Sequence, residues 1–191
     1  LWKPFTSSTR IGSFESRSGC IFVGGFRHTP NVKGIQWFAN EVLPILRDFG
    51  YDEVIRIVGA GLDLETEALL KKLNLDVFGG VDERELIDLY SNSKIAIIPL
   101  LTGRGLKGKF AEAASYNLPI VSTIAGAEGF TSTTSSGFSI SASPKEFAES
   151  IFRLAKSKSE WEQAQNSITG FCASYLSEER FMNDLRGVLG S

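Results

Sequence analysis

A glycine-rich, cationic segment at residues 103–113 combines residue types that suit the binding of phosphate. Its three glycines let the backbone approach an anion closely, and its two lysines add positive charge: Gly103, Gly105, Gly108, Lys107 and Lys109. The segment lies between an apolar run at residues 95–99 and a helix expected to end at Tyr116. Loops between a strand and a helix of a parallel sheet usually meet the ligand. The segment therefore predicts a phosphate site.

The two lysines stand near the expected start of a helix, where a cation is unfavourable. A helix start carries about half a positive charge, so a cation there costs roughly 0.3–1 kcal/mol unless an anion offsets it. A bound phosphate would supply that anion. In the alternative interpretation, both lysines extend into solvent and the glycines only shape a turn. Local sequence leaves both interpretations open.

The rest of the chain repeats one pattern of apolar run, glycine-rich or polar turn, and amphipathic helix. The expected strands are Ile21–Val23, Ile55–Val58, Val77–Phe78, Ile95–Ile98, Ile120–Val121 and a weaker one near Phe138–Ile140. The first expected helix is capped by Thr29, has Pro30 at its first position and reaches Phe49 with a kink at Pro44. Other expected helices are one capped by Asp82 and Glu85, one ended by a left-handed Asn117, and later ones at Pro144–Lys156, Glu160–Tyr175 and about Ser177–Leu189.

Strands that alternate with helices imply parallel pairing through right-handed crossovers. The fold class predicted is therefore α/β, a doubly wound parallel sheet of the Rossmann-like kind. The carboxyl ends of the strands carry glycine bends at residues 24–25, 59–61 and 79–80, in addition to the segment at 103–108. A ligand is expected at that edge, although such folds also use glycine turns for structure alone.

Composition limits the classes of function. A net charge of −2 and a pI near 5.6 argue against a nucleic-acid partner. Cys20 and Cys172 lack metal-ligand or redox spacing and are expected to be reduced in a cytoplasmic protein, and His28, the one histidine, cannot form a metal cluster. No apolar run reaches the roughly 20 residues that cross a bilayer. Residues 1–19, which begin with Leu1, are expected to be a linker from an upstream domain, and residues 20–191 the domain itself.

A series of spaced motifs resembles one known family. The motifs are Phe22-Val23-Gly24-Gly25-Phe26 with His28, Pro30, Asn31 and Trp37-Phe38, then Gly79 and Asp82, Pro99 through Lys109, Glu112-Ala113, Pro119-Ile120-Val121, and Gly126-Ala127-Glu128-Gly129. In this order they resemble the carboxy-terminal half of a GT-B glycosyltransferase of the retaining, family-4-like group. The resemblance covers about residues 20–175.

The resemblance implies that this half binds a nucleotide-diphosphate sugar as donor substrate and that a missing amino-terminal domain holds the acceptor. It implies no cofactor and no catalytic metal, because backbone amides and basic side chains stabilise the departing diphosphate. Lys107 and Lys109 are the residues expected in that catalytic role. Any association with a membrane surface would come through the missing half alone.

The resemblance also implies a set of donor-binding residues. They are Gly24, Gly25, Arg27, Lys33, Phe78, Gly79, Gly103, Arg104, Gly105, Leu106, Gly108 and Glu112. Glu112 matches the second glutamate of the family's paired-glutamate motif and would accept hydrogen bonds from the ribose hydroxyls, whereas the first glutamate is replaced by Arg104. Phe78 and Gly79 stand where relatives hold the base.

Two other functions stay open from the sequence. One is a nucleotide-sugar epimerase of the same architecture, which would need catalytic acids and histidines that the chain does not visibly supply. The other is a non-catalytic binding or interaction module, in which Arg104 marks the loss of donor chemistry. A transferase half of this kind is expected to hold the donor but not to transfer the sugar alone.

Overall fold

The structure, a computed structural model, describes residues 12–102, 108–128 and 137–175. Its centre is one parallel sheet of six strands: β1 Cys20–Val23, β2 Ile55–Val58, β3 Asp76–Phe78, β4 Ile95–Ile98, β5 Ile120–Thr123 and β6 Phe138–Ser141. Their order across the sheet is β3-β2-β1-β4-β5-β6. All five pairings are parallel, which confirms the predicted doubly wound α/β fold.

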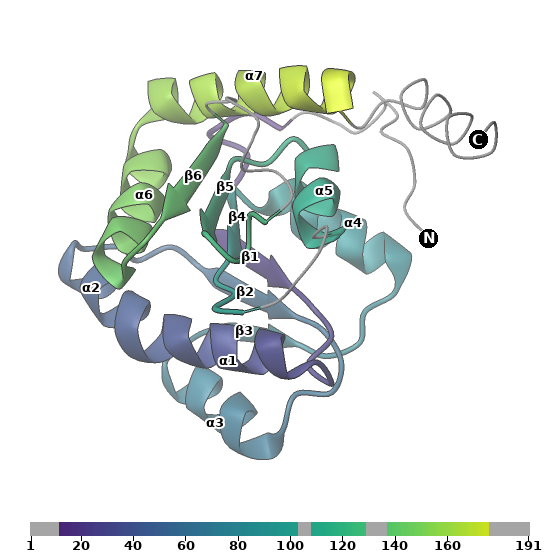
Figure 1. The fold of residues 1–191 in the computed structure, drawn as a ribbon, viewed down its shortest axis with the longest axis vertical. Coiled ribbons are helices and arrows are strands. Elements are labelled where there is room, and N and C mark those ends of the chain that lie inside the picture. Colours follow the sequence, from purple (N-terminus) through teal and green to yellow (C-terminus); the bar gives the residue numbers. More distant parts are fainter. Residues whose placement is uncertain (1–11, 103–107, 129–136, 176–191) are drawn as a thin grey trace.

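Helices cover both faces of the sheet, as Figure 1 shows with α4 and α5 on its right and α2 and α6 on its left. They are α1 Thr29–Trp37, α2 Leu43–Asp48, α3 Leu64–Lys72, α4 Glu83–Asn92, α5 Gly108–Ser115, α6 Pro144–Lys156 and α7 Lys158–Tyr175, with the short η1 Phe38–Val42 between α1 and α2. Because both faces are covered, all four residues of β4 and of β5 are buried.

Each face of the sheet has its own apolar core. On one face, Phe22 and Ile57 pack with residues of α1, η1, α2, α3 and α6, including the fully buried Phe38 and Phe147. On the other, Ile21 and Ile120 pack with residues of α4, α5 and α7, including Phe110 and Ile168. The alternation of neighbours such as Ile21 and Phe22 between the two cores follows from the two-residue period of a strand.

Local end signals in the sequence place several helix boundaries correctly. Asp82 caps α4, where its side chain accepts a hydrogen bond of 2.8 Å from the amide of Glu85. Asp63, which was not among the predicted caps, caps α3 in the same way through the amide of Thr66. Asn117 ends α5 with φ of 57°, the left-handed conformation predicted for it.

The first predicted helix differs from expectation at both its start and its middle. Thr29 lies inside α1, and His28 precedes it as a cap residue without a side-chain hydrogen bond, so the predicted Thr29 cap is wrong. The helix is also not simply kinked at Pro44: a π-helical turn, η1, separates α1 from α2. Pro44 has no amide hydrogen, and the preceding Leu43 amide bonds to the carbonyl of Phe38 across the wider turn.

Part of the segment expected to be a linker packs on the sheet domain. The Arg17 side chain is buried, and its two terminal nitrogens donate to the carbonyls of Ser93 (3.4 Å) and Tyr116 (3.3 Å). The Phe14 ring meets the Trp161 ring edge-on, with centroids 5.8 Å apart. The division of the chain at residue 19 stays a prediction, and the expected last helix lies outside the described residues.

Within the described ranges, no helix has both the length and the apolar character needed to cross a membrane.

Candidate functional site

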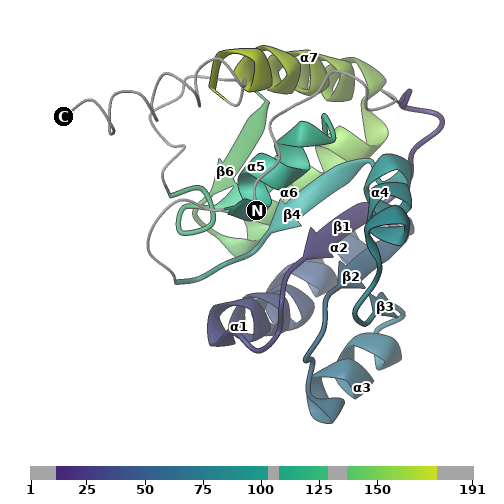
Figure 2. The same cartoon turned by 90° about the vertical axis from the view of Figure 1, so that its right-hand side faces the viewer.

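The order of strands reverses between β1 and β4, and this reversal creates the place where a ligand can enter. The chain leaves β1 for α1 on one face of the sheet and leaves β4 for α5 on the other face. Two neighbouring loops therefore diverge at the carboxyl edge, and Figure 2 shows α1 and α5 on opposite sides of β1 and β4. In doubly wound folds, ligands bind in the crevice that such divergence opens.

Backbone hydrogen bonds join the loops that follow β1, β2 and β3 into one rim. The amide of Gly24 donates to Val58 (2.9 Å), that of Phe26 to Ala60 (2.9 Å), and that of Gly59 to Phe78 (3.0 Å). A Cβ atom at Gly59 would lie 2.0 Å from the carbonyl oxygen of Gly24, so no larger residue fits there without a shift. The glycine bends predicted to meet at one edge do lie together.

Lys109 reaches from α5 to the first of these bends. A Cβ atom at Gly24 would lie 2.8 Å from Cε of Lys109 and 3.1 Å from Nδ2 of Asn31. Asn31 is buried, and its side chain donates a hydrogen bond of 2.6 Å to the carbonyl of Gly25, which fixes the loop. The half-buried Lys109 therefore lies between the strand ends of β1 and β4, where the sequence predicted a cation for phosphate.

Glu112 lies almost one helical turn after Lys109 in α5 and is half-buried. One of its carboxylate oxygens accepts a hydrogen bond of 3.2 Å from the hydroxyl of Tyr90 in α4. Burial raises the pKa of Glu112 above its usual value, while the Tyr90 hydrogen bond and the charge of Lys109 lower it. The carboxylate thus lies between α4 and α5, on the same side of the sheet as Lys109.

The other predicted donor-binding residues differ in their exposure to solvent and in the elements that carry them. Arg27 is exposed, and its Cγ would lie 2.9 Å from a Cβ at Gly61, so its stem runs toward the loop after β2. Lys33 is exposed on α1, and Phe78 is half-buried at the end of β3. Gly25, Gly79 and Gly108 are exposed. The segment Gly103–Lys107, with Arg104, lies outside the described residues.

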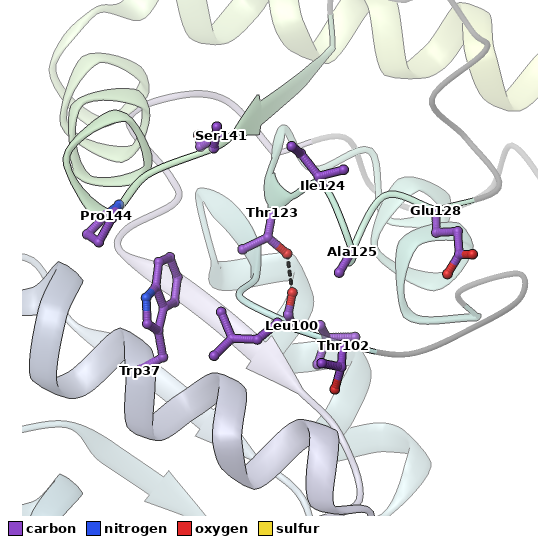
Figure 3. A pocket seen from close by; sticks show the side chains of 11 residues that line it. Trp37, Leu100, Thr102, Thr123, Ile124, Ala125, Glu128, Ser141 and Pro144 are labelled. Atoms are coloured by element: carbon purple, nitrogen blue, oxygen red, sulfur yellow. Dashed lines mark hydrogen bonds between the residues drawn. The ribbon is translucent and has the colours of Figure 1, made fainter.

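A second concavity of about 690 Å³ opens at the same edge, beyond β4, and was not predicted from the sequence. Trp37, Leu100, Thr123, Ile124 and Pro144 are among its lining residues (Figure 3). The hydroxyl of Thr123, the last residue of β5, donates to the carbonyl of Leu100, which ties the end of β5 to the loop after β4. Its lining is mainly apolar, with hydroxyl groups at intervals, and no single sequence motif marks it because it collects residues from several loops.

The sequence did not reveal that two further residues, Tyr90 and Asn31, make contacts that hold the predicted site residues in place. Tyr90 meets Glu112 across 22 positions of the chain, and Asn31 fixes Gly25. A tyrosine at helical spacing in α4 is typical of a core residue, so only the fold reveals its contact. In the parts of the chain that the structure describes, no group of three or more histidine, cysteine, aspartate or glutamate side chains could hold a metal ion.

Comparison with known proteins places this geometry in a family. The profile of the family described as glycosyl transferases group 1 matches residues 17–157. A protein of Klebsiella pneumoniae described as an uncharacterized 44.6 kDa protein in the cps region is 26% identical over 168 residues, which cover 84% of this chain and 43% of that protein. The chain thus spans less than half the length of that relative.

Solved structures share the fold at low sequence identity. The carboxy-terminal domain of a group 1 family glycosyltransferase, LpcC of Francisella tularensis, has a TM-score of 0.65 and 19% identity, with 83% of this chain and 85% of that chain covered. S. aureus TarM has a TM-score of 0.73 and 12% identity, with 100% and 38% covered. Since the family profile covers more than half of the sequence, the chain belongs to the group 1 glycosyltransferases.

Proposed function

We propose that this chain binds the nucleotide-diphosphate sugar donor of a group 1 glycosyltransferase. The diphosphate would lie at the divergence of the loops after β1 and β4, and the ribose would lie against Glu112. The base would lie toward Phe78 and Gly79. Arg27 and Lys33 remain predicted donor contacts, as do Gly103, Arg104, Gly105, Leu106 and Lys107.

One observation carries the proposal: Lys109 bridges α5 and the first glycine loop at the reversal of strand order. Its Cε would lie 2.8 Å from a Cβ at Gly24, so the cation and the backbone bend face the same space. Glu112 follows on the same helix and supplies a carboxylate that can accept two hydrogen bonds from a vicinal diol. A cation, a close backbone and a diol acceptor are the groups that a nucleoside diphosphate requires.

The proposed chemistry follows from where charge develops. As the bond between the sugar carbon and the diphosphate oxygen breaks, the electron pair stays on that oxygen. A new bond forms between the sugar carbon and the acceptor oxygen, and the proton of the acceptor hydroxyl passes to the leaving diphosphate. Negative charge therefore grows on the leaving diphosphate, and donors fixed there stabilise the transition state more than the ground state. Lys109, with Lys107 as its predicted partner, would provide this stabilisation.

The structures of relatives support the proposal that a nucleoside diphosphate binds to this fold. A structure of S. aureus TarM was solved in complex with UDP, among other molecules, and TarM shares the fold along the whole of this chain. Because this chain covers 43% of the Klebsiella relative, we propose that a further part of a longer protein binds the acceptor. We expect this chain alone to show no sugar transfer. From the family resemblance we also propose that the transfer retains the configuration at the sugar carbon.

Cys20 and Cys172 are both free and buried, which supports the predicted cytoplasmic location.

Isothermal titration calorimetry of this chain with UDP, GDP and ADP tests donor binding directly. We expect saturable binding of at least one of the three. Absence of binding to all three would reject the proposal and favour a non-catalytic interaction module. Turnover of a nucleotide sugar onto an acceptor by this chain alone would contradict the proposed division of labour.

Lys109→Ala tests the residue on which the proposal rests. We expect the affinity for the nucleoside diphosphate to fall about ten- to a hundredfold, because a charge-assisted hydrogen bond contributes about 1.5–3 kcal/mol and 1.4 kcal/mol corresponds to a factor of ten. Lys145→Ala is a matched control, since Lys145 is likewise the second residue of a helix, α6, and is exposed. Equal affinities of the two variants would remove Lys109 from the site.

A further inference from the structure

We propose that Tyr90 is a positioning residue for Glu112 and so determines how strongly the site prefers ribonucleotides over nucleotides that lack ribose hydroxyls. This inference rests on the proposed function, since it assigns Glu112 to the ribose. It concerns a residue of α4 that is fully buried in the core and would not itself touch the ligand.

The contact between Tyr90 and Glu112 fixes one carboxylate oxygen and leaves the other for a ligand. The Tyr90 hydroxyl donates to Oε2 of Glu112 at 3.2 Å. An ionised carboxylate has two oxygens and about four acceptor positions, so a single donor from the protein does not exhaust it. Because Tyr90 already holds the Glu112 carboxylate through one oxygen, the carboxylate loses less rotational freedom when a diol binds to the other oxygen.

The Tyr90 ring is itself held in place from several directions. It stacks on the Tyr116 ring, with centroids 4.4 Å apart and planes 8° from parallel. It also lines a small void of about 10 Å³ with Ile21, Ala96 and the side chain of Lys109. Such a void offers no room for the ring to move, so the hydroxyl direction is set by the packing of α4 against the sheet.

The charged and titratable groups around this carboxylate come from two helices. Burial is the main influence on the pKa of Glu112 and raises it, whereas the hydrogen bond from Tyr90 of α4 and then the charge of Lys109, almost one turn earlier in α5, lower it. Burial raises the pKa of Tyr116, which directly follows α5, and the charges of Glu112 and of Glu83 in α4 raise it further. Loss of the Tyr90 hydroxyl therefore makes Glu112 easier to protonate.

The test compares affinities for a nucleoside diphosphate and its 2′,3′-dideoxy analogue, using UDP, GDP or ADP according to the calorimetric screen. Protonation of the phosphates affects both ligands alike and cancels in their ratio. In Tyr90→Phe we expect the affinity for the nucleoside diphosphate, divided by that for the analogue, to fall about 3- to 10-fold, because one hydrogen bond is lost. The affinity for the analogue itself should change little. We also expect the ratio to decline with falling pH in the unaltered chain, and to decline at a higher pH in Tyr90→Phe.

Tyr116→Phe is the matched control, because it removes a hydroxyl from the other ring of the same stack and should keep both the ratio and its pH dependence. Glu112→Asp is a second variant that leaves Tyr90 in place but shortens the carboxylate by one methylene, and it should lose the preference for ribose. An unchanged ratio in Tyr90→Phe, an equal loss for both ligands, or full preference in Glu112→Asp would each overturn the assignment. If no nucleoside diphosphate binds the unaltered chain, the donor site itself fails and the role of Tyr90 fails with it.

Discussion

Charged residues have different roles at the two ends of the parallel strands, which form the amino edge and the carboxyl edge of the sheet. At the amino edge, Glu53 accepts from the amide of Gly19 at 2.6 Å and pairs with Lys94 at 3.3 Å. Lys94 is buried, and its backbone carbonyl accepts a hydrogen bond of 2.8 Å from the Trp161 ring nitrogen. The charged contacts join the residues that precede β1, β2 and β4, and the carbonyl of Lys94 adds a neutral contact to α7. The partners of these charges are protein groups from distant parts of the sequence.

At the carboxyl edge, by contrast, backbone hydrogen bonds and the neutral side chain of Asn31 hold the loops, and the charged side chains lie where the loops after β1 and β4 diverge. Lys109 and Glu112 are only half-buried there, beside glycine bends such as Gly24. The comparison teaches that charge near the ends of this sheet has two roles. At one end it ties distant elements of the fold together, and at the other we propose that it contacts the ligand.

The largest effect that would sharpen this contrast comes from Glu53→Ala. The substitution leaves the buried ammonium of Lys94 and the amide of Gly19 without their carboxylate, and breaking such a pair costs about 3–5 kcal/mol. In denaturant unfolding we expect a loss of about that size and an unchanged affinity for nucleoside diphosphate. Glu67→Ala, which removes an exposed pair with Lys71, should cost less than about 1 kcal/mol. Similar stability of both variants would break the contrast.

A smaller effect is expected at the carboxyl edge from Gly24→Ala. The new methyl group would lie 2.8 Å from Cε of Lys109 and 3.0 Å from the Phe22 ring, so the flexible lysine end must move. We expect the affinity for nucleoside diphosphate to fall about tenfold, equivalent to 1.4 kcal/mol, while unfolding changes by less than that. The measurement is calorimetry paired with a denaturation curve. Full affinity with reduced stability would mean that Gly24 serves the fold alone.

The smallest effect concerns the stability of the free chain and its dependence on pH. Because burial raises the folded pKa of Glu112, its stabilising contribution is present at low pH and is lost as the pH rises through that pKa. Glu112→Gln stays neutral, so we expect its Tm to exceed that of the unaltered chain by up to a few degrees at pH 8.

This gain should disappear below about pH 4, where the unaltered glutamate is protonated in both states. Scanning calorimetry across this range is the measurement. Glu149→Gln, on an exposed face of α6, should show no such gain. A lower Tm for Glu112→Gln at every pH would make Glu112 a stabilising group like Glu53.

The features predicted well from sequence are those that local chemistry determines. Short apolar runs such as Ile95–Ile98 became strands because a parallel sheet buries them on both faces, and Asp82 capped its helix through an amide three residues away. The glycine bends gathered at one edge because parallel strands end there. The charge and glycine content of the segment at 103–113 indicated Lys109, and the family resemblance added Glu112.

The features that sequence did not reveal depend on contacts between distant residues. Glu53, Lys94 and Arg17 carry no local sign of burial, since their partners come from other elements. The same holds for Tyr90, whose hydroxyl meets Glu112 only after α4 and α5 pack together. The π-helical turn before Pro44 depends on how a helix accommodates a missing amide, which apolar spacing does not report.

The rim formed by the bonds from Gly24 to Val58, from Phe26 to Ala60 and from Gly59 to Phe78 consists of main-chain atoms alone. Every amino acid carries the carbonyl oxygens that accept these bonds. Side chains at exposed points along the rim, such as Ala60, can consequently be exchanged without loosening it. A test of the proposed base site could therefore randomise that position first, and we expect most variants to remain folded.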